Sequence, residues 1–181
     1  MPELRSDARQ NRDAILRAAV SALEESADAS LNAIAKRAGV GIGTLYRHFP
    51  TREDLMVEVY RSEVQQLVDL APALLAKHPP PRALRLWLDR LAEYGNAKAG
   101  LAGAFAAATH DRLNAETYGP IVGALDALLA ANKKAGTVRK GASADELIVM
   151  LGFLWRIDPS SDWKGQARRG LDILVDGLRP S

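Results

Sequence analysis

Apolar residues recur at helical spacing along almost the whole of this sequence, and that periodicity restricts the possible folds more than any other feature. Positions i, i+3, i+4 and i+7 share one face of an α-helix. The pattern occurs at 15–23, 31–38, 42–49, 55–68, 84–94, 121–129, 147–155 and 171–178. No segment alternates apolar and polar residues as a half-buried strand does. The sequence therefore predicts an all-α fold of about eight to ten helices.

Composition narrows the class of protein. The chain has 181 residues and no cysteine, which excludes disulfides, cysteine-ligated zinc and thiol chemistry and fits a reducing compartment. The polar N-terminus lacks the apolar core of a signal peptide, and no apolar run reaches the ~18 residues of a membrane helix. A net charge of +2 permits nucleic-acid binding without requiring it. We therefore expect a cytoplasmic protein with no membrane segment.

Residues that favour helix ends mark the boundaries in the first part of the chain. Ser30 is a suitable N-cap for the helix that follows it, and Gly39 can take the left-handed conformation that ends it. Pro50 ends the next helix, since the residue before a proline avoids helical angles. The run Thr-Arg-Glu-Asp at 51–54 has the form of a capping box and predicts the start of a long helix.

Further boundaries follow in the second part. Lys-His-Pro-Pro-Pro at 77–81 predicts a stiff loop rather than a flexible linker. The glycines between 95 and 103 predict a break in the helix, followed by a shorter helix that ends at Ala108. Ser-Ala-Asp-Glu at 143–146 forms a second capping box. The last two long helices are expected at about Asp145 to Ile157 and Asp162 to Leu178.

Two short helices near the N-terminus have the lengths and the turn of a helix-turn-helix. The first spans about Leu31 to Arg37 and the second about Ile42 to His48. Gly39 lets the chain reverse within about four residues without a β-carbon clash. In such a unit the second helix lies in the major groove of DNA while the first crosses the backbone. This pattern predicts a DNA-binding head.

The second short helix has two different sides. Its first residues are small, which allows close approach to a duplex: Gly41, Gly43 and Thr44. The next can reach phosphates or base edges: Tyr46, Arg47 and His48. Its apolar residues are expected to anchor it to the first and third helices: Ile42, Leu45 and Phe49. Arg52 begins the following helix, where the helix N-terminus and the guanidinium both favour phosphate.

Residues 31–55, which read LNAIAKRAGVGIGTLYRHFPTREDL, resemble the head of the tetracycline-repressor (TetR) family. Its most specific part is Gly-Thr-Leu-Tyr-x-His-Phe at 43–49, and 11–19 resembles that family's first helix. A weaker likeness to one branch of the family's regulatory domains covers 83–105. The resemblance implies a three-helix DNA-binding head at 8–60, with the helix-turn-helix at about 30–49. A long helix would join it to a helical ligand-binding and dimerisation body at 61–181.

The resemblance also implies which residues bind DNA. Base reading would fall to residues 41–44, and most other contacts would be to phosphates. The set that would touch DNA is Ser30, Gly41, Ile42, Gly43, Thr44, Tyr46, Arg47, His48 and Arg52. Many members of the family have a hydroxyl where this chain has Gly41 and a lysine where it has Arg52. Direct hydrogen-bond readout is therefore expected to be sparse, with more weight on DNA shape and thymine methyl groups.

The implied body would bind a small apolar or amphipathic effector rather than a cofactor, because its surroundings are apolar and Ala-rich. The residues expected to line that site are Trp87, Tyr94, Phe105, His110, Tyr118, Met150 and Trp155. Aromatic and Met residues at helical spacing also serve as ordinary core, and that alternative stays open for each. His110 is equally a candidate for a helix-end residue.

The family further implies a homodimer, formed through the last two helices, on a palindromic double-stranded DNA operator. Small residues in those helices, Gly152 and Gly170, would allow close helix contact, although a core role is an equal alternative for each stripe. The expected function is a ligand-responsive transcriptional regulator, a repressor more than an activator. One alternative is a dimeric DNA-binding regulator without an effector, and another is a helical binding module or enzyme with a vestigial head.

The sequence offers no enzymatic or metal site. The three histidines, His48, His78 and His110, are far apart, and no His-Glu-x-x-His motif occurs. The glycines at 39, 41 and 43 follow a helix rather than a strand, so they do not form a dinucleotide loop. No Gly-x-Ser-x-Gly elbow is present. Asp89 and Glu93, with arginines beside them, are more simply a charged helix surface. We expect neither catalytic residues nor metal ligands.

Overall fold

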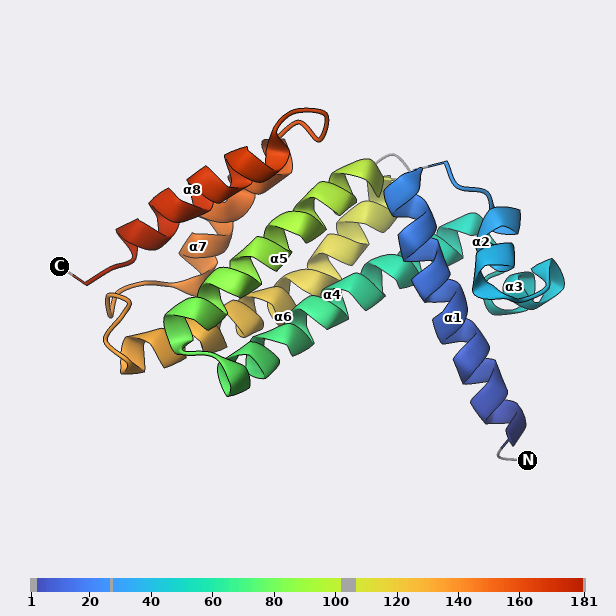
Figure 1. The fold of residues 1–181 in the computed structure, drawn as a ribbon, viewed down its shortest axis with the longest axis horizontal. Coiled ribbons are helices and arrows are strands. Elements are labelled where there is room, and N and C mark those ends of the chain that lie inside the picture. Colours follow the sequence, from blue (N-terminus) through green and yellow to red (C-terminus); the bar gives the residue numbers. More distant parts are fainter. Residues whose placement is uncertain (1–2, 27, 102–106, 181) are drawn as a thin grey trace. The chain divides into compact units, whose positions relative to one another are not determined.

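The computed structural model describes residues 3–26, 28–101 and 107–180, and every regular element in these ranges is a helix (Figure 1). The all-α prediction is confirmed. In chain order the helices are α1 (Glu3–Glu25), α2 (Leu31–Ala38), α3 (Ile42–His48), α4 (Arg52–Lys77), α5 (Pro80–Leu101), α6 (Ala107–Lys134), α7 (Ala144–Met150), the 3-10 helix η2 (Leu151–Arg156) and α8 (Trp163–Gly177).

The described chain divides into two compact units, which we treat separately. Among the described residues, the first covers 3–26, 28–62 and 107, and the second covers 63–101 with 108–180. Helix α4 contributes its first residues to the first unit and the rest to the second. No helix among the described residues has the length and apolar character needed to cross a bilayer. In the same ranges no group of acidic and histidine side chains is arranged to hold a metal ion.

In the first unit, α1 packs against α2 and α3, and local capping sets where the helices begin and end. The Ser30 hydroxyl accepts a hydrogen bond from the Ala33 amide (3.2 Å), as its N-cap position predicts. Gly39 has φ = +71°, a left-handed conformation that costs other residues about 1–2 kcal/mol. The amide of Val40 then bonds the Ala35 carbonyl (3.1 Å), so the turn to α3 is closed by backbone bonds.

Helix α4 begins with the capping box that the sequence predicts. The Asp54 amide donates to the Thr51 hydroxyl, and the Thr51 amide donates to the Asp54 carboxylate, both at 3.0 Å. An aspartate here does what glutamate or glutamine does in most such boxes. The predicted box at 143–146 does not form in this way, because Ser143 occupies the N-cap of α7 without a side-chain cap bond.

In the second unit, α5 continues through Gly95 and ends at Leu101, which lies within the range 95–103 where the sequence predicts a break. Gly95 is buried, and a Cβ there would meet Leu154 and Trp155 at 3.8–3.9 Å, so tertiary packing supports the helix where propensity weakens it. The prediction of a shorter helix that ends at Ala108 is wrong. Helix α6 starts at Ala107 and continues through Pro120 to Lys134, while 102–106 lie outside the described residues.

The penultimate long helix is likewise not continuous. Helix α7 ends at Met150, and residues 151–156 form a 3-10 helix, whereas α8 has almost the predicted bounds and is capped by Asp162. Gly170 makes a close contact within the chain, because a Cβ there would stand 2.4 Å from the Phe153 ring, which fits the core role given as the alternative; the predicted contact between two copies stays a prediction. Gly152 has open space at the same point and makes no such contact.

The core of the second unit is formed by apolar residues from α4, α5 and α6. Trp87 is fully buried, and its indole nitrogen donates to the Leu67 carbonyl (2.8 Å), which joins α5 to α4. Asn132 is the most deeply buried polar side chain described, and its amide bonds the carbonyls of Pro80 and Leu128 (both 2.9 Å). These bonds satisfy polar groups that would otherwise be costly to bury.

Candidate nucleic-acid interface

Helix α3 is fixed in the first unit by its apolar side. Leu45 is fully buried and Phe49 is 2% exposed, as predicted for anchors. The prediction that Ile42 is a third anchor is wrong, because its side chain is 37% exposed. Ile42 shares a face with Leu45 but stands one turn earlier, at the first residue of the helix, beyond the buried part of that face. The side chain of Ile42 is therefore accessible to a partner.

The opposite side of α3 is open to solvent. Tyr46 is 49% exposed and Arg47 is exposed. A Cβ at Gly41 or Gly43 would meet nothing within 4 Å, so the backbone at the front of the helix has no side chain over it. Thr44 is half-buried between these residues. A surface with a bare front and longer polar side chains behind it can approach another molecule closely.

Three more of the predicted DNA-binding residues lie at helix ends. Ser30 is exposed at the start of α2, with its hydroxyl bonded to the Ala33 amide. His48 is half-buried, and its ring is tilted by 46° against that of Phe49. Arg52 is half-buried, and its Nη1 donates to the Ala29 carbonyl at 2.5 Å. Arg52 thus fastens the start of α4 to the chain before α2, and its contact with phosphate stays a prediction.

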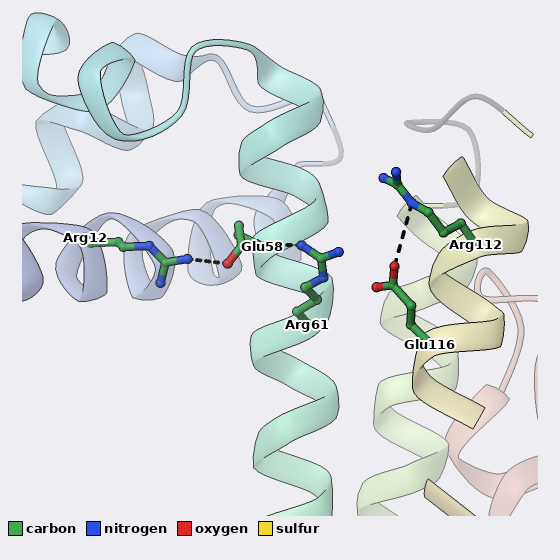
Figure 2. A network of polar contacts seen from close by, with 5 residues as sticks. All are labelled: Arg12, Glu58, Arg61, Arg112 and Glu116. Atoms are coloured by element: carbon green, nitrogen blue, oxygen red, sulfur yellow. Dashed lines mark hydrogen bonds and ion pairs between the residues drawn. The ribbon is translucent and has the colours of Figure 1, made fainter. Parts of the chain in front are cut away.

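An arginine network, which the sequence did not reveal, joins α1 to α4 within the first unit. Glu58 accepts hydrogen bonds from both Arg12 and Arg61, as Figure 2 shows. The Arg12 guanidinium also lies 5.7 Å from the centroid of the Phe49 ring, within cation–π range. Arg12 is therefore held by α4 and by the end of α3, and its contacts fix α1 to both.

A second tie joins α1 to α2. Arg37 donates to the Ser21 hydroxyl (3.1 Å) and to the Glu25 carboxylate (2.6 Å). The hydrogen bond from Arg37 lowers the pKa of Glu25 below its usual value, with the positive charge adding to the effect. The same bond raises the pKa of Arg37 above its usual value. Partners 12 residues or more apart leave no local signal, which is why the sequence predicted neither tie.

In the second unit, the residues predicted to line an effector site have different environments. Trp87 and Tyr94 are buried, and Trp155 is half-buried beside Gly95. Tyr118 and Met150 are 46% and 57% exposed. Phe105 lies outside the described residues, and of His110 only its place in α6 is described. Their assignment to one effector site stays a prediction.

The second unit has a groove that the sequence analysis did not single out. It lies between α5 and α8 and has a volume of about 640 Å³. Trp163 and Leu171 belong to its apolar part, and Arg85, Asp89 and Asp172 to its charged part. The available signal was the pair Lys164 and Arg168, which are four residues apart beside a tryptophan.

Comparison with known proteins gives two family matches. Residues 15–59 match the family described as "Bacterial regulatory proteins, tetR family". Residues 79–180, more than half of the chain, match "Transcriptional regulator SbtR-like, C-terminal domain". The two matches together cover the reading head and the helical part that follows it.

Two solved structures and one sequence relative that are similar to this chain are also described as transcriptional regulators. The TetR transcriptional regulator SCO0520 of Streptomyces coelicolor is 42% identical, with a TM-score of 0.83 over 94% of this chain and 99% of its own. A TetR regulatory protein of Mycobacterium vanbaalenii is 31% identical, with a TM-score of 0.77 over 98% of this chain and 99% of its own. An HTH-type transcriptional regulator of Staphylococcus aureus (strain USA300) is 40% identical over 63 residues. That match covers 34% of this chain and 34% of the relative, so it spans about a third of the relative's length.

Proposed function

Since the chain belongs to the tetracycline-repressor (TetR) family, and is a DNA-binding transcriptional regulator rather than an enzyme, we propose that it binds a palindromic operator as a homodimer and acts as a ligand-responsive repressor. Its place of action would be the cytoplasm, where the DNA of a bacterial cell lies. The observation that carries the proposal is the open face of α3, with Tyr46 49% exposed beside two bare glycines and a buried anchor at Leu45.

In this proposal α3 lies in the major groove. Its front, residues 41–44, stands closest to the base edges, and the exposed Ile42 can contact a thymine methyl group. Tyr46, Arg47 and His48, with Ser30 and Arg52, contact phosphates and fix the register. Because the front carries one hydroxyl and no amide or charge, sequence-dependent DNA shape supplies much of the specificity.

Dimerisation is supported by apolar side chains that the second unit leaves in solvent. Val149 and Ile173 are each 75% exposed, and Met150 is 57% exposed. These residues belong to α7 and α8, the helical region predicted to join two copies. A two-fold dimer would present two heads to half-sites one or more helical turns apart, which matches a palindromic operator.

Effector response is supported by a second unit that is compact by itself and has an open groove. The effector, a small apolar or amphipathic molecule, would favour a conformation whose heads are wrongly spaced for successive major grooves. To move such an equilibrium from almost all bound to almost all free, it must prefer one state by on the order of 10⁴-fold. An effector-free dimeric regulator is the second candidate, and equal ligand affinity for free and DNA-bound protein would favour it.

The test is a selection of bound sequences from random duplex DNA at near-physiological salt, using the full chain. We expect an inverted repeat to be enriched. Replacing Thr44 and Tyr46 by alanine should abolish the enrichment, because these side chains stand on the open face of α3. Tyr118→Ala is the matched control, since Tyr118 is similarly exposed, at 46%, but lies in the second unit.

Three other outcomes would each limit the proposal in a different way. Failure of the natural sequence to enrich any motif, with binding that falls steeply as salt rises, would reduce the head to a non-specific DNA contact. Equal loss of enrichment in the Tyr118→Ala protein would mean that the variants act through general instability. Enrichment of a single half-site without its inverted copy would remove the dimer from the proposal but keep the reading helix.

A further inference from the structure

The groove between α5 and α8 combines an apolar floor with charged edges, entirely within the second unit. Its floor is formed by Ala92, Ala167 and Leu171, which are 1–6% exposed, and half-buried Trp163 stands at one end. The volume of about 640 Å³ lies within the ~300–1,000 Å³ of typical ligand pockets. The groove is therefore large enough to cover a small molecule's apolar part.

The carboxylates of the groove already have cationic partners. Arg85 bonds Asp89 on its own helix (3.0 Å) and Asp172 across the groove. Glu93 is paired with Arg90 at 3.3 Å. Each of these three carboxylates therefore has an arginine partner, although Arg85 is shared by two of them and Arg90 also bonds Glu63 (2.8 Å).

Two cations of the groove are different. Lys164 and Arg168 are exposed, stand one helical turn apart on α8, and take part in no ion pair among the described residues. Lys164 lies 5.6 Å from the centroid of the Trp163 ring, so its charge is beside the apolar end of the groove. The groove lining has three acidic and three basic side chains, and Lys164 and Arg168 are the two whose positive charge is not used in an ion pair among the described residues.

We propose that this groove binds a small amphipathic anion, and that such a molecule is the effector; the second statement rests on the proposed function. The carboxylate or phosphate group is held by Lys164 and Arg168, since charge-assisted hydrogen bonds are the strong ones. The apolar part lies along the half-buried Trp163 ring, where it leaves water.

The proposed dimer leaves this site open. Successive residues of an α-helix are about 100° apart, so Ile173 points about 200° away from Leu171. Leu171 lines the groove and is buried, whereas Ile173 is 75% exposed on the other side of α8. A second copy seated on Ile173 would not fill the groove, and ligand binding does not compete with dimerisation.

Binding is measured by calorimetry on the full chain, without DNA, with four probes of equal chain length below their micelle concentrations. The probes are decanoate, decyl phosphate, decanol and decyltrimethylammonium. We expect one or both anions to bind at least ~10-fold more tightly than the alcohol and the cation. In Lys164→Gln/Arg168→Gln this preference should disappear. The control, Lys133→Gln/Lys134→Gln, removes two cations from the end of α6, outside the groove, and should keep it.

Each other result overturns the inference. Equal affinity for all four probes would make the groove a non-selective apolar surface, and absence of binding would remove the site. Equal weakening in the control variant would assign the preference to net charge. A smaller sedimentation mass for the groove variant would mean that a second copy occupies this face.

The DNA selection separates this inference from the proposed function. A motif without anion binding leaves the DNA-reading proposal intact and rejects the groove as an effector site. Anion binding without an enriched motif keeps the groove as an anion site and rejects the DNA-reading proposal. When both occur, adding the bound anion to the operator complex should release the natural protein and not the Lys164→Gln/Arg168→Gln protein. Continued DNA binding by the natural protein would refute the effector role.

Discussion

A single glycine sets how closely α8 approaches η2. A Cβ at Gly170 would lie 2.4 Å from Cε2 and 2.5 Å from Cζ of Phe153, closer than carbon atoms can approach without movement. Either the ring or the helix must therefore shift when this position carries a side chain. The close approach depends on one residue type at one place, and it can be tested by one methyl group.

We expect Gly170→Ala to lower the free energy of unfolding by about 1–3 kcal/mol, the usual cost of overpacking. Urea denaturation followed by circular dichroism measures the change. Gly123→Ala is the control, because Gly123 is exposed in α6 with nothing near its Cβ position. That change should stabilise the protein by ~0.5–1 kcal/mol through helix propensity.

A double-mutant cycle identifies the cause. With Phe153→Ala already present, Gly170→Ala should cost much less than in the natural protein, because the ring that it strikes is gone. Full additivity of the two changes would show that the loss comes from elsewhere.

At the scale of helices, the two ion pairs of Glu58 differ in which parts of the chain they connect. Arg61 and Glu58 are three residues apart on α4, so their bond joins nothing that the helix does not already join. Arg12 connects α1 to α4 (Figure 2), and its guanidinium also faces the Phe49 ring at the end of α3. Of the two bonds that Glu58 accepts, the one from Arg12 joins two helices and the one from Arg61 lies within α4.

We expect Arg12→Gln to destabilise the protein by about 1 kcal/mol, because it removes both the ion pair with Glu58 and the cation–π contact with Phe49. Thermal unfolding at low and at 0.5 M salt measures the loss, and salt should reduce it only partly, because the ring contact does not depend on the ion pair. An unchanged melting temperature in the Arg12→Gln protein would argue against a special role for Arg12.

At the level of the whole molecule, the second unit leaves apolar side chains in water that a monomer gains nothing by exposing. Val149 and Ile173 are each 75% exposed, in helices that belong to the region matched by the C-terminal family domain. Exposed apolar residues that are scattered singly need no explanation, but those on the elements expected to dimerise supply a specific test.

We expect Ile173→Glu, alone or with Val149→Glu, to convert the dimer to a monomer in sedimentation velocity, because burying an unpaired carboxylate is costly. Ala127→Glu introduces the same charge at an exposed position of α6 and should leave the dimer intact. Persistence of the dimer in the Ile173→Glu/Val149→Glu protein would place the interface on another surface. A monomeric natural protein would refute the dimer itself.

The features that the sequence determined by itself are local ones. Helical periodicity, the Ser30 cap, the Gly39 turn and the box of Thr51 with Asp54 each depend on residues at most five positions apart, and the structure has all of them. The head could be recognised for the same reason, since its turn chemistry and apolar spacing lie within one short segment.

Tertiary structure decided what depends on distant partners. Helix α5 continues through Gly95 because η2 packs beside it. Arg12 donates a hydrogen bond to Glu58, which is 46 residues away in the sequence. Ile42 carries the apolar pattern of an anchor, yet it is exposed because burial depends on what covers a face as well as on the pattern of that face. The groove likewise exists only where α5 and α8 meet, and the sequence did not show that its carboxylates pair with Arg85 and Arg90 and leave Lys164 and Arg168 without an ion pair among the described residues.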